Sequence, residues 1–163
     1  MQTTVFHTLI IGAGAAGMMC AARIGQRGHS VALLDHATKI GEKIRISGGG
    51  RCNFTNHHLN GHDGSQYYVS QQPRFVRHAL SRYTAQDFIR LVEQYGIAYH
   101  EKHKGQLFCD GSAQEIIAML QNECAQGQVS WHTGCPIEAV TRLADGSFEV
   151  RSSQGVFRCT NLI

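Results

Sequence analysis

A short run of glycines and alanines near the N-terminus has the spacing that binds the phosphates of a dinucleotide. It is Gly12-Ala13-Gly14-Ala15-Ala16-Gly17, with the pattern G-x-G-x-x-G. In this pattern the first glycine permits a tight turn, the second lets the backbone approach a pyrophosphate, and the third lets a helix lie close to a strand. The start of that helix offers free N–H groups and a partial positive charge to the phosphates.

Asp35 lies at the distance along the chain where a dinucleotide-binding domain has an acidic ribose ligand. Its carboxylate would accept hydrogen bonds from a ribose hydroxyl and repel a 2′-phosphate, which favours FAD over NADP. We place its neighbour His36 in the same predicted site. The alternative is a purely structural turn, with Asp35 as the solvated end of a strand.

A second glycine-rich stretch, residues 41–56, contains more binding groups than a nicotinamide cofactor needs. Three successive glycines leave space where a flat or charged group comes close, and cations and neutral hydrogen-bonding side chains surround them. A flavin cofactor, with a pyrophosphate, a ribityl chain and a ring to hold, could use such a loop. The predicted cofactor-binding residues of this stretch are Lys43, Ser47, Gly48, Gly49, Gly50, Arg51, Cys52 and Asn53, with Arg45, Thr55 and Asn56 as further polar groups.

Residues 47–56, SGGGRCNFTN, resemble the signature S-G-G-G-R-C-N-x-T-N of the BaiN/RdsA family of FAD-dependent oxidoreductases, the aminoacetone oxidase-like flavoproteins. The resemblance extends through the whole chain and includes Lys104-Gly105-Gln106-Leu107-Phe108. Asp35 stands where flavoproteins of this type more often have Glu, so its carboxylate has a reach shorter by one methylene. The combination of both glycine motifs is specific.

The resemblance implies an α/β fold: a Rossmann-like FAD-binding domain of the glutathione-reductase type, with a parallel sheet, helices and a small antiparallel β-meander. It implies that residues 1–163 are the N-terminal part of a bipartite domain, incomplete at the C-terminus, with an inserted substrate domain and a C-terminal flavin-binding segment absent. By the same alignment Ile137 is a neighbour of the adenine through its backbone, although a plain core position is an equal alternative.

For activity, the resemblance implies hydride transfer by FAD to or from an unsaturated carbon, with NAD(P)H as a candidate reductant. The roles assigned in the family range from reducing steroid-type double bonds to reducing uridine in ribosomal RNA. A small-molecule substrate and an RNA substrate therefore both stay open, and no catalytic residue can be named. Two alternatives to an oxidoreductase stay open: a nucleotide-binding module without catalysis and an RNA-binding accessory protein.

The first glycine pattern requires a strand before it and a helix after it, and the sequence predicts both. Val5–Ile11 is a β-branched, apolar run that is typical of a buried parallel strand. Gly14–Arg27 is rich in alanine and methionine, which favours a helix that Gly28 ends. Ser30–Leu34 is the second strand, so the chain opens with a βαβ unit.

Beyond this unit the pattern changes twice. Residues 36–73 show little periodicity, which in a compact domain indicates a functional or disordered loop. Short strands of period two then dominate from Val129 onward. The predicted later elements are a helix over Pro73–Arg82, helices capped by Thr84 with Asp87 and by Ser112 with Glu115, and strands at Ala98–His103, Gln106–Phe108, Val129–His132, Ile137–Leu143, Phe148–Arg151 and Val156–Cys159.

Other conspicuous residues have structural interpretations that we favour. Cys52 has no Cys-x-x-Cys partner, so a packing thiol is a better interpretation than a redox thiol. Arg51 could pair with a phosphate or stabilise the negative charge of reduced flavin. The alternative for Arg51 is a salt bridge within the loop. The histidines His57, His58 and His62 lack zinc-site spacing, and we expect no metal there. A basic face of the predicted helix over Pro73–Arg82 contains Arg74, Arg77, His78 and Arg82. We interpret it as a solvated face, with a nucleic-acid surface as the alternative.

Composition limits the class of protein. The chain has 163 residues, 42% hydrophobic and 17% charged, which suits a globular domain with a real core. A net charge of +3 permits an anionic ligand but is weaker than that of a dedicated nucleic-acid binder. No run is long enough to cross a bilayer, and none of the six cysteines has disulfide-framework or zinc spacing. We expect a cytoplasmic protein with reduced thiols and no membrane partner.

The last residues, Asn161-Leu162-Ile163, begin an apolar run with no turn after it. We interpret this run as the start of a central parallel strand, and its end as a cut. Central parallel strands are buried on both faces, so the expectation is that the 163 residues alone self-associate or bind FAD weakly.

Overall fold

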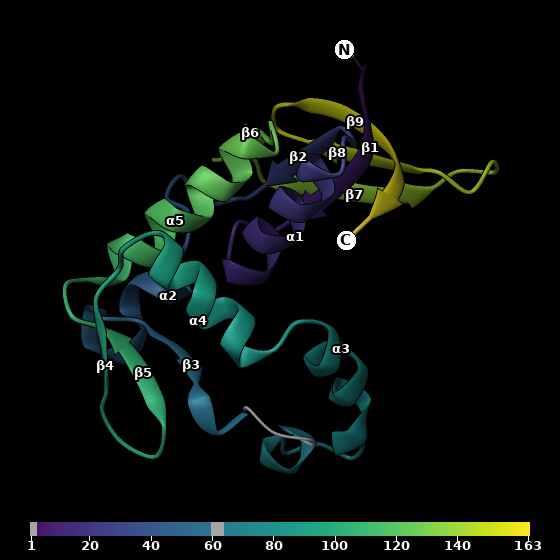
Figure 1. The fold of residues 1–163 in the computed structure, drawn as a ribbon. Helices are drawn as coiled ribbons and strands as arrows, with labels where there is room; N and C mark the ends of the chain where they lie inside the picture. Colours follow the sequence, from purple (N-terminus) through teal and green to yellow (C-terminus); the bar gives the residue numbers. More distant parts are fainter. Residues whose placement is uncertain (1–2, 60–63) are drawn as a thin grey trace. The chain divides into compact units, whose positions relative to one another are not determined.

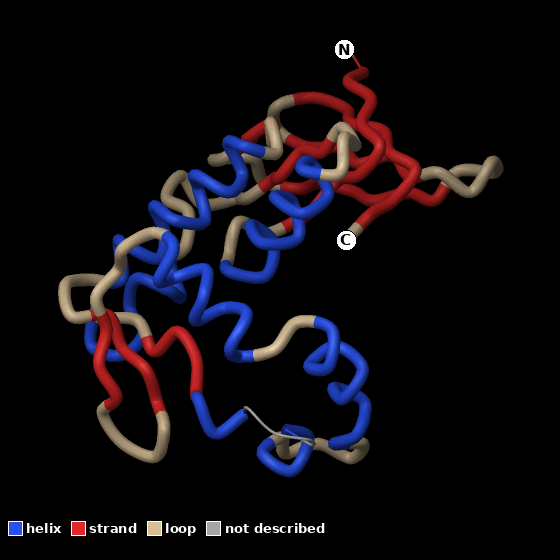
Figure 2. The backbone as a smooth tube through the Cα atoms, in the orientation of Figure 1, coloured by secondary structure: helices blue, strands red, loops and turns tan. Residues whose placement is uncertain are grey.

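The computed structural model describes residues 3–59 and 64–163. It contains two compact units, one formed by Met1–Ile44 with Ile117–Ile163 and the other by Arg45–Ile116 (Figure 1). Each unit has its own sheet, and the strands of both are red in Figure 2. No helix of the described part is both long and apolar enough to cross a membrane.

The first unit is built on a six-stranded sheet with the order β6-β2-β1-β9-β8-β7. Four neighbouring strands, β6, β2, β1 and β9, are parallel, while β8 runs antiparallel to both of its neighbours. The sheet therefore combines a Rossmann-like parallel part with a small antiparallel meander, as expected. The strands are β1 (Thr3–Ile11), β2 (Val31–Leu34), β6 (Ser130–His132), β7 (Ile137–Arg142), β8 (Phe148–Ser152) and β9 (Gly155–Leu162).

The predicted βαβ opening is confirmed. Helix α1 (Ala15–Gln26) connects β1 to β2 and buries Met18, Ala21 and Ala22. Strand β2 lies between β1 and β6, and all four of its residues are buried. A parallel strand covered on both faces needs apolar residues throughout, which explains the uninterrupted Val-Ala-Leu-Leu.

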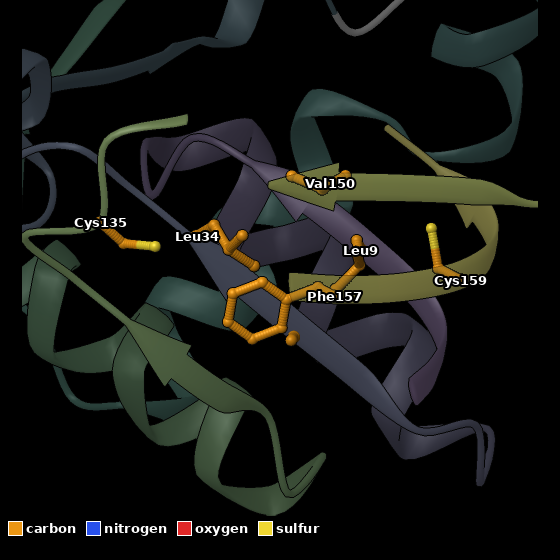
Figure 3. Close-up of a cluster of buried hydrophobic side chains, with 7 residues drawn as sticks. Leu9, Leu34, Cys135, Val150, Phe157 and Cys159 are labelled. Carbon is orange, nitrogen blue, oxygen red and sulfur yellow. The ribbon is translucent and has the colours of Figure 1, made fainter. Parts of the chain in front are cut away.

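The core of the first unit lies under the centre of the sheet. Figure 3 shows side chains from both the parallel strands and the meander meeting there. Ala32 belongs to the same cluster, and Phe6, Ile137, Phe148 and Leu162 pack against it. The labelled members are Leu9, Leu34, Cys135, Val150, Phe157 and Cys159. This core holds β1 and β2 in place, and the candidate site begins at the carboxyl ends of these two strands.

The second unit has a three-stranded antiparallel sheet with the order β3-β5-β4. Both predicted helix caps of the chain are present: Thr84 and Asp87 form a capping box, and Glu115 accepts a 2.9 Å hydrogen bond from the Ser112 N–H. The elements are β3 (Asn53–Asn56), β4 (Tyr99–Glu101), β5 (Gln106–Cys109), α3 (Arg77–Arg82) and α4 (Ala85–Gln94), with α2 (Glu42–Ile46) and α5 (Ala113–Gln126) crossing between the units.

Three expectations were wrong in detail. The described part of residues 36–73 contains short helices and a strand, because glycine-rich and polar segments can fold locally without a hydrophobic period. Pro73–Arg82 is a 3₁₀ turn η4 (Pro73–Val76) followed by α3, not one helix. The chain end is the last part of β9, which begins at Gly155, so Asn161 and Leu162 do not start a new strand.

Candidate functional site

The first glycine turn has the geometry that its sequence predicts. Gly12 has φ +116°, a conformation that side chains rarely adopt, and its N–H donates to the Leu34 carbonyl at 2.7 Å. A Cβ on Gly17 would lie 1.9 Å from the Gly12 carbonyl oxygen, so α1 can approach β1 only because this residue is glycine. A Cβ on Gly14 would meet no protein atom within 4 Å. Gly12 and Gly17 are therefore required by the fold, whereas Gly14 is not.

The N-terminus of α1 is open toward solvent. Its first intrahelical hydrogen bond runs from the Met18 N–H to the Gly14 carbonyl at 2.9 Å, so the N–H groups of Ala15, Ala16 and Gly17 have no partner within the helix. The N-cap Gly14 supplies no side-chain cap, and the first turn contains no acidic residue. Gly14, Ala15 and Ala16 are exposed. These donors and the helix dipole together suit a pyrophosphate.

Asp35, at the end of β2, is bonded to the glycine turn. Its Oδ2 accepts from the Ala13 N–H at 2.6 Å and its Oδ1 from the Ala37 N–H at 2.8 Å. The Asp35 side chain is only 15% exposed, and the exposed imidazole of His36 lies 3.4 Å from Oδ1. A carboxylate has about four lone-pair sites, so acceptor capacity remains for a ribose hydroxyl. Asp35 is therefore no solvated strand end: it also holds the turn in place.

One supporting residue was missed from the sequence. The N–H of Gly41 donates to the Ala13 carbonyl at 3.0 Å, and Gly41 has φ +68°. Ala13, only 1% exposed, is thus held on both sides, through its N–H by Asp35 and through its carbonyl by Gly41. The signal available was the isolated glycine itself, because glycine is the residue that adopts a positive φ without steric cost.

In the second unit, the glycine triplet lies in a left-handed backbone conformation, with φ of 58° at Gly48, 67° at Gly49 and 85° at Gly50. A Cβ on Gly48 would lie 2.6 Å from the Phe108 ring, so this glycine allows close packing inside the protein. A Cβ on Gly49 or Gly50 would meet nothing within 4 Å. Space for a ligand therefore exists at Gly49 and Gly50 and not at Gly48.

The polar residues around this triplet differ in their surroundings. Arg51 and Asn53 are exposed, and Ser47 is half-buried. Arg45 donates to the Gln114 side chain at 2.6 Å, so it binds the start of α5. In the first unit, Lys43 is exposed on α2. Arg51 and Lys43 are thus the accessible cations of the predicted set, each in its own unit.

Cys52 is a packing thiol, as its sequence context indicated. It is 5% exposed, and burial raises the pKa of its thiol, against a smaller lowering by a hydrogen bond with Ser47. Cys109 on β5 is fully buried, and burial raises its pKa to about 12, with smaller contributions from Cys52, Glu115 and Asp110. Both thiols stay protonated at neutral pH, and all six cysteines are free. Protonated buried thiols are poor nucleophiles.

Ile137 opens β7 and is half-buried, with its side chain packed against the core of the first unit. The side chain therefore has the structural role that was one of the two interpretations. A backbone contact with adenine would not compete with this packing, and it stays a prediction.

The structure brings a carboxylate to two of the histidines. The ligand atoms of His57, His58 and Glu101 all lie within 4.8 Å of one another, and His57 Nδ1 is 3.6 Å from Glu101 Oε2. Two imidazoles and a carboxylate could hold a divalent ion. Spacing in the sequence could not show this group, because Glu101 reaches the histidines through the β4–β5 hairpin. His62 lies outside the described residues.

Comparison with known proteins identifies relatives. A family model described as HI0933-like protein Rossmann domain matches residues 6–163. The chain is 51% identical to the ribosomal RNA dihydrouridine synthase of Escherichia coli over 84% of its length, and 45% identical to that of Haemophilus influenzae over 96%. It is 28% identical to the 3-dehydro-bile acid delta(4,6)-reductase of Clostridium scindens over 94%. The chain spans only 33–39% of the length of these relatives.

Solved structures share the fold at low sequence identity. L-proline dehydrogenase from P. horikoshii matches 99% of this chain with a TM-score of 0.63 and 9% identity, and the chain covers 52% of it. NikD, an amino acid oxidase, matches 98% with a TM-score of 0.58 and 13% identity, and the chain covers 51% of it. Both likenesses support the predicted Rossmann-like architecture.

Proposed function

The chain belongs to the HI0933-like Rossmann family, and we propose that the protein carrying it is an FAD-dependent oxidoreductase that reduces uridine in ribosomal RNA. The observation that carries the cofactor proposal is the uncapped N-terminus of α1 beside Asp35. Exposed N–H donors and an available carboxylate suit the pyrophosphate and a ribose of a dinucleotide. The bipartite domain, the inserted domain and the cytoplasmic location stay predictions.

We propose roles for the predicted binding residues of the first unit: Gly14, Ala15 and Ala16 bind the pyrophosphate, Asp35 binds the adenosine ribose, and Lys43 and His36 add positive charge. That the loop from Ser47 to Asn53 binds the flavin stays an expectation from its sequence, and Gly49 and Gly50 are the open positions of that loop. Bound FAD would supply hydride transfer, while the protein supplies orientation and electrostatics.

The substrate proposal rests on sequence identity. The relatives at 45–51% identity are named ribosomal RNA dihydrouridine synthases, while the bile-acid reductase is at 28%. The first name contains a reduced product and the second names a reductase, and both are consistent with hydride transfer to an unsaturated carbon. NAD(P)H is the proposed reductant, because its hydride and a proton from solvent together balance the reduction of one double bond.

Two measurements test the function. The protein carrying this chain is denatured and the released cofactor identified by chromatography; we expect FAD, and recovery of NADP or of no flavin after reconstitution contradicts the cofactor proposal. Its gene is then expressed in a strain whose ribosomal RNA lacks dihydrouridine, and nucleosides from that RNA are analysed by mass spectrometry. Dihydrouridine should appear; its absence despite bound FAD contradicts the substrate proposal alone.

A further inference from the structure

A run of three short helices in the second unit combines exposed aromatic rings with exposed arginines. We call it the aromatic–basic segment, residues 64–83; it contains η3 (Gly64–Tyr67), η4 (Pro73–Val76) and α3 (Figure 1). The three helices pack on one another, and a Cβ on Gly64 would lie 3.1 Å from the Leu80 side chain. Nevertheless, η4 and α3 contain no buried residue. The segment is thus folded but presents most of its side chains outward.

Aromatic rings are exposed along this segment. Phe75 is 84% exposed and Tyr67 55%, with Tyr68 at 40% and Tyr83 at 37%. The sequence predicted a basic helix face here, and the structure adds that Phe75 lies on the surface beside Arg74. Exposed aromatic side chains in a cluster mark an interaction site more often than single exposed apolar residues do. They also provide flat faces on which other rings can stack.

The charges of the segment have one sign. Arg74, Arg77 and Arg82 are exposed, and the sequence has no Asp or Glu from Gly64 to Gln86. A segment with cations and aromatic rings and without carboxylates of its own is complementary to a partner that carries both negative charge and flat rings.

We propose that the aromatic–basic segment binds single-stranded RNA, with arginines on phosphates and Phe75 and Tyr67 stacked on bases. Single-strand binding sites combine these two elements, and stacking does not depend on a particular base. The assignment of RNA, as opposed to another polyanion, rests on the proposed function, whose substrate is ribosomal RNA. A membrane surface fits less well, because α3 has six residues and offers no continuous apolar helix face.

The two contributions predict different changes in binding. Loss of one stacked base costs about 5- to 140-fold in affinity, equivalent to about 1–3 kcal/mol. Loss of one phosphate contact instead lowers the slope of log K against log salt by about 0.7 for a single strand. Phe75→Ala should therefore weaken binding at every salt concentration, whereas Arg74→Gln with Arg82→Gln should reduce the salt slope by about 1.4.

The test is fluorescence anisotropy with a labelled oligouridylate of about 12 nucleotides, within the ~4–16 nucleotides of single-strand sites. The protein carrying this chain is titrated without reductant, so that no turnover occurs. The variants are Phe75→Ala and Arg74→Gln/Arg82→Gln. Phe75→Trp should retain affinity because it keeps a stacking face. Arg142→Gln/Arg151→Gln removes two exposed arginines from the first unit as a charge-matched control and should change little.

Several results would overturn the inference. Phe75→Ala could bind oligouridylate as tightly as the parent, or the parent could bind a duplex of equal length as tightly as the single strand. Phe75→Ala could also leave RNA binding intact while it abolishes binding to phosphatidylglycerol vesicles or alters the elution volume in size-exclusion chromatography, which would indicate a membrane or protein contact. Far-UV circular dichroism shows whether each variant is folded, and flavin content tests the proposed function separately. A protein that contains no FAD but whose RNA affinity depends on Phe75 would contradict the proposed function and leave this inference standing.

Discussion

Gly14 and Gly17 belong to one motif, but a side chain would have a different effect at each. At Gly14, with φ −85° and ψ −174°, the backbone suits any residue, and an added Cβ would meet no protein atom within 4 Å. We expect Gly14→Val to abolish FAD binding, because its side chain would occupy the position of the pyrophosphate, and to leave stability unchanged. At Gly17 the added Cβ would lie 1.9 Å from a carbonyl oxygen. We expect Gly17→Val to lower the free energy of unfolding by ~1–3 kcal/mol, as overpacking does.

Flavin absorbance and urea denaturation measure these two effects on the same samples. Glu138→Ala serves as a control, since Glu138 is an exposed residue of β7 and takes no part in the proposed site. Normal flavin occupancy in Gly14→Val would contradict the placement of the pyrophosphate. An unchanged urea midpoint in Gly17→Val would contradict the close approach of α1 to β1.

Asp35 has a second role that the sequence did not show, because the partners of its carboxylate are backbone groups. Asp35→Ala would leave the N–H groups of Ala13 and Ala37 without their acceptor. An unsatisfied buried donor costs ~1–3 kcal/mol, and Ala13 is buried. We therefore expect a loss of about that size in the free energy of unfolding of the FAD-free protein, together with weaker FAD binding. Chemical denaturation of FAD-free samples, compared with Asp145→Ala in an exposed turn, measures it.

The alternative outcome for Asp35 is also informative. A ribose ligand with no structural role would lower flavin affinity and leave the FAD-free protein as stable as the parent. That result would contradict the hydrogen bonds to Ala13 and Ala37, and not the proposed cofactor.

At the scale of elements, the sequence predicted what is local. The βαβ opening follows from one apolar run, one glycine pattern and one alanine-rich helix, and the caps at Thr84 and Ser112 follow from side chains three residues apart. The parallel pairing of β9 with β1 does not follow from its sequence, because it joins the two ends of the chain, whereas the pairing of β8 with β9 is a local hairpin. For the same reason the approach of Glu101 to His57 could not be predicted.

The short helices within residues 36–73 were missed for another reason. The triplet Gly48-Gly49-Gly50 folds through left-handed backbone conformations, and these leave no hydrophobic period. In the aromatic–basic segment a helix over Pro73–Arg82 was predicted, but not its division into η4 and α3, neither of which has a buried side. Hydrophobic periodicity reports burial, so an element with no buried face gives no such signal.

The capping box of α4 predicts a dependence on pH. The pKa of Asp87 is lowered from 3.8 to about 2, first by hydrogen bonds with the Thr84 side chain and backbone and then by Arg90. A lowered pKa means that the carboxylate stabilises the fold above about pH 4 and that this contribution is lost as the pH falls toward 2. Thr84→Ala should cost about 1 kcal/mol at neutral pH, and the difference from the parent should shrink over that window.

Urea denaturation of parent and Thr84→Ala at several pH values between neutral and acid measures this difference. Thr84→Ser, which keeps the hydroxyl, is the matched control and should behave as the parent does. A difference that stays constant down to pH 2 would show that Asp87 takes no part in the cap.

At the scale of the whole molecule, the proposed cofactor has one half that depends on the first unit alone. The α1 N-terminus and Asp35, which are proposed to bind the pyrophosphate and a ribose, both belong to that unit. FAD and FMN share the flavin ring, but only FAD has the adenylate that the first unit is proposed to bind. The choice between these two flavins therefore tests the first unit.

We expect FAD to stabilise the protein and FMN to do so much less. A ligand that binds only the folded state at 100 times its Kd adds about 2.7 kcal/mol to the free energy of unfolding, and ADP should give part of this effect by filling the same half of the site. NADP should add little, because its 2′-phosphate would face the Asp35 carboxylate. Thermal or urea denaturation of the FAD-free protein with each ligand measures the order. Equal stabilisation by FMN and FAD would mean that the α1 N-terminus and Asp35 contribute nothing to cofactor binding, and the first unit would then need another ligand.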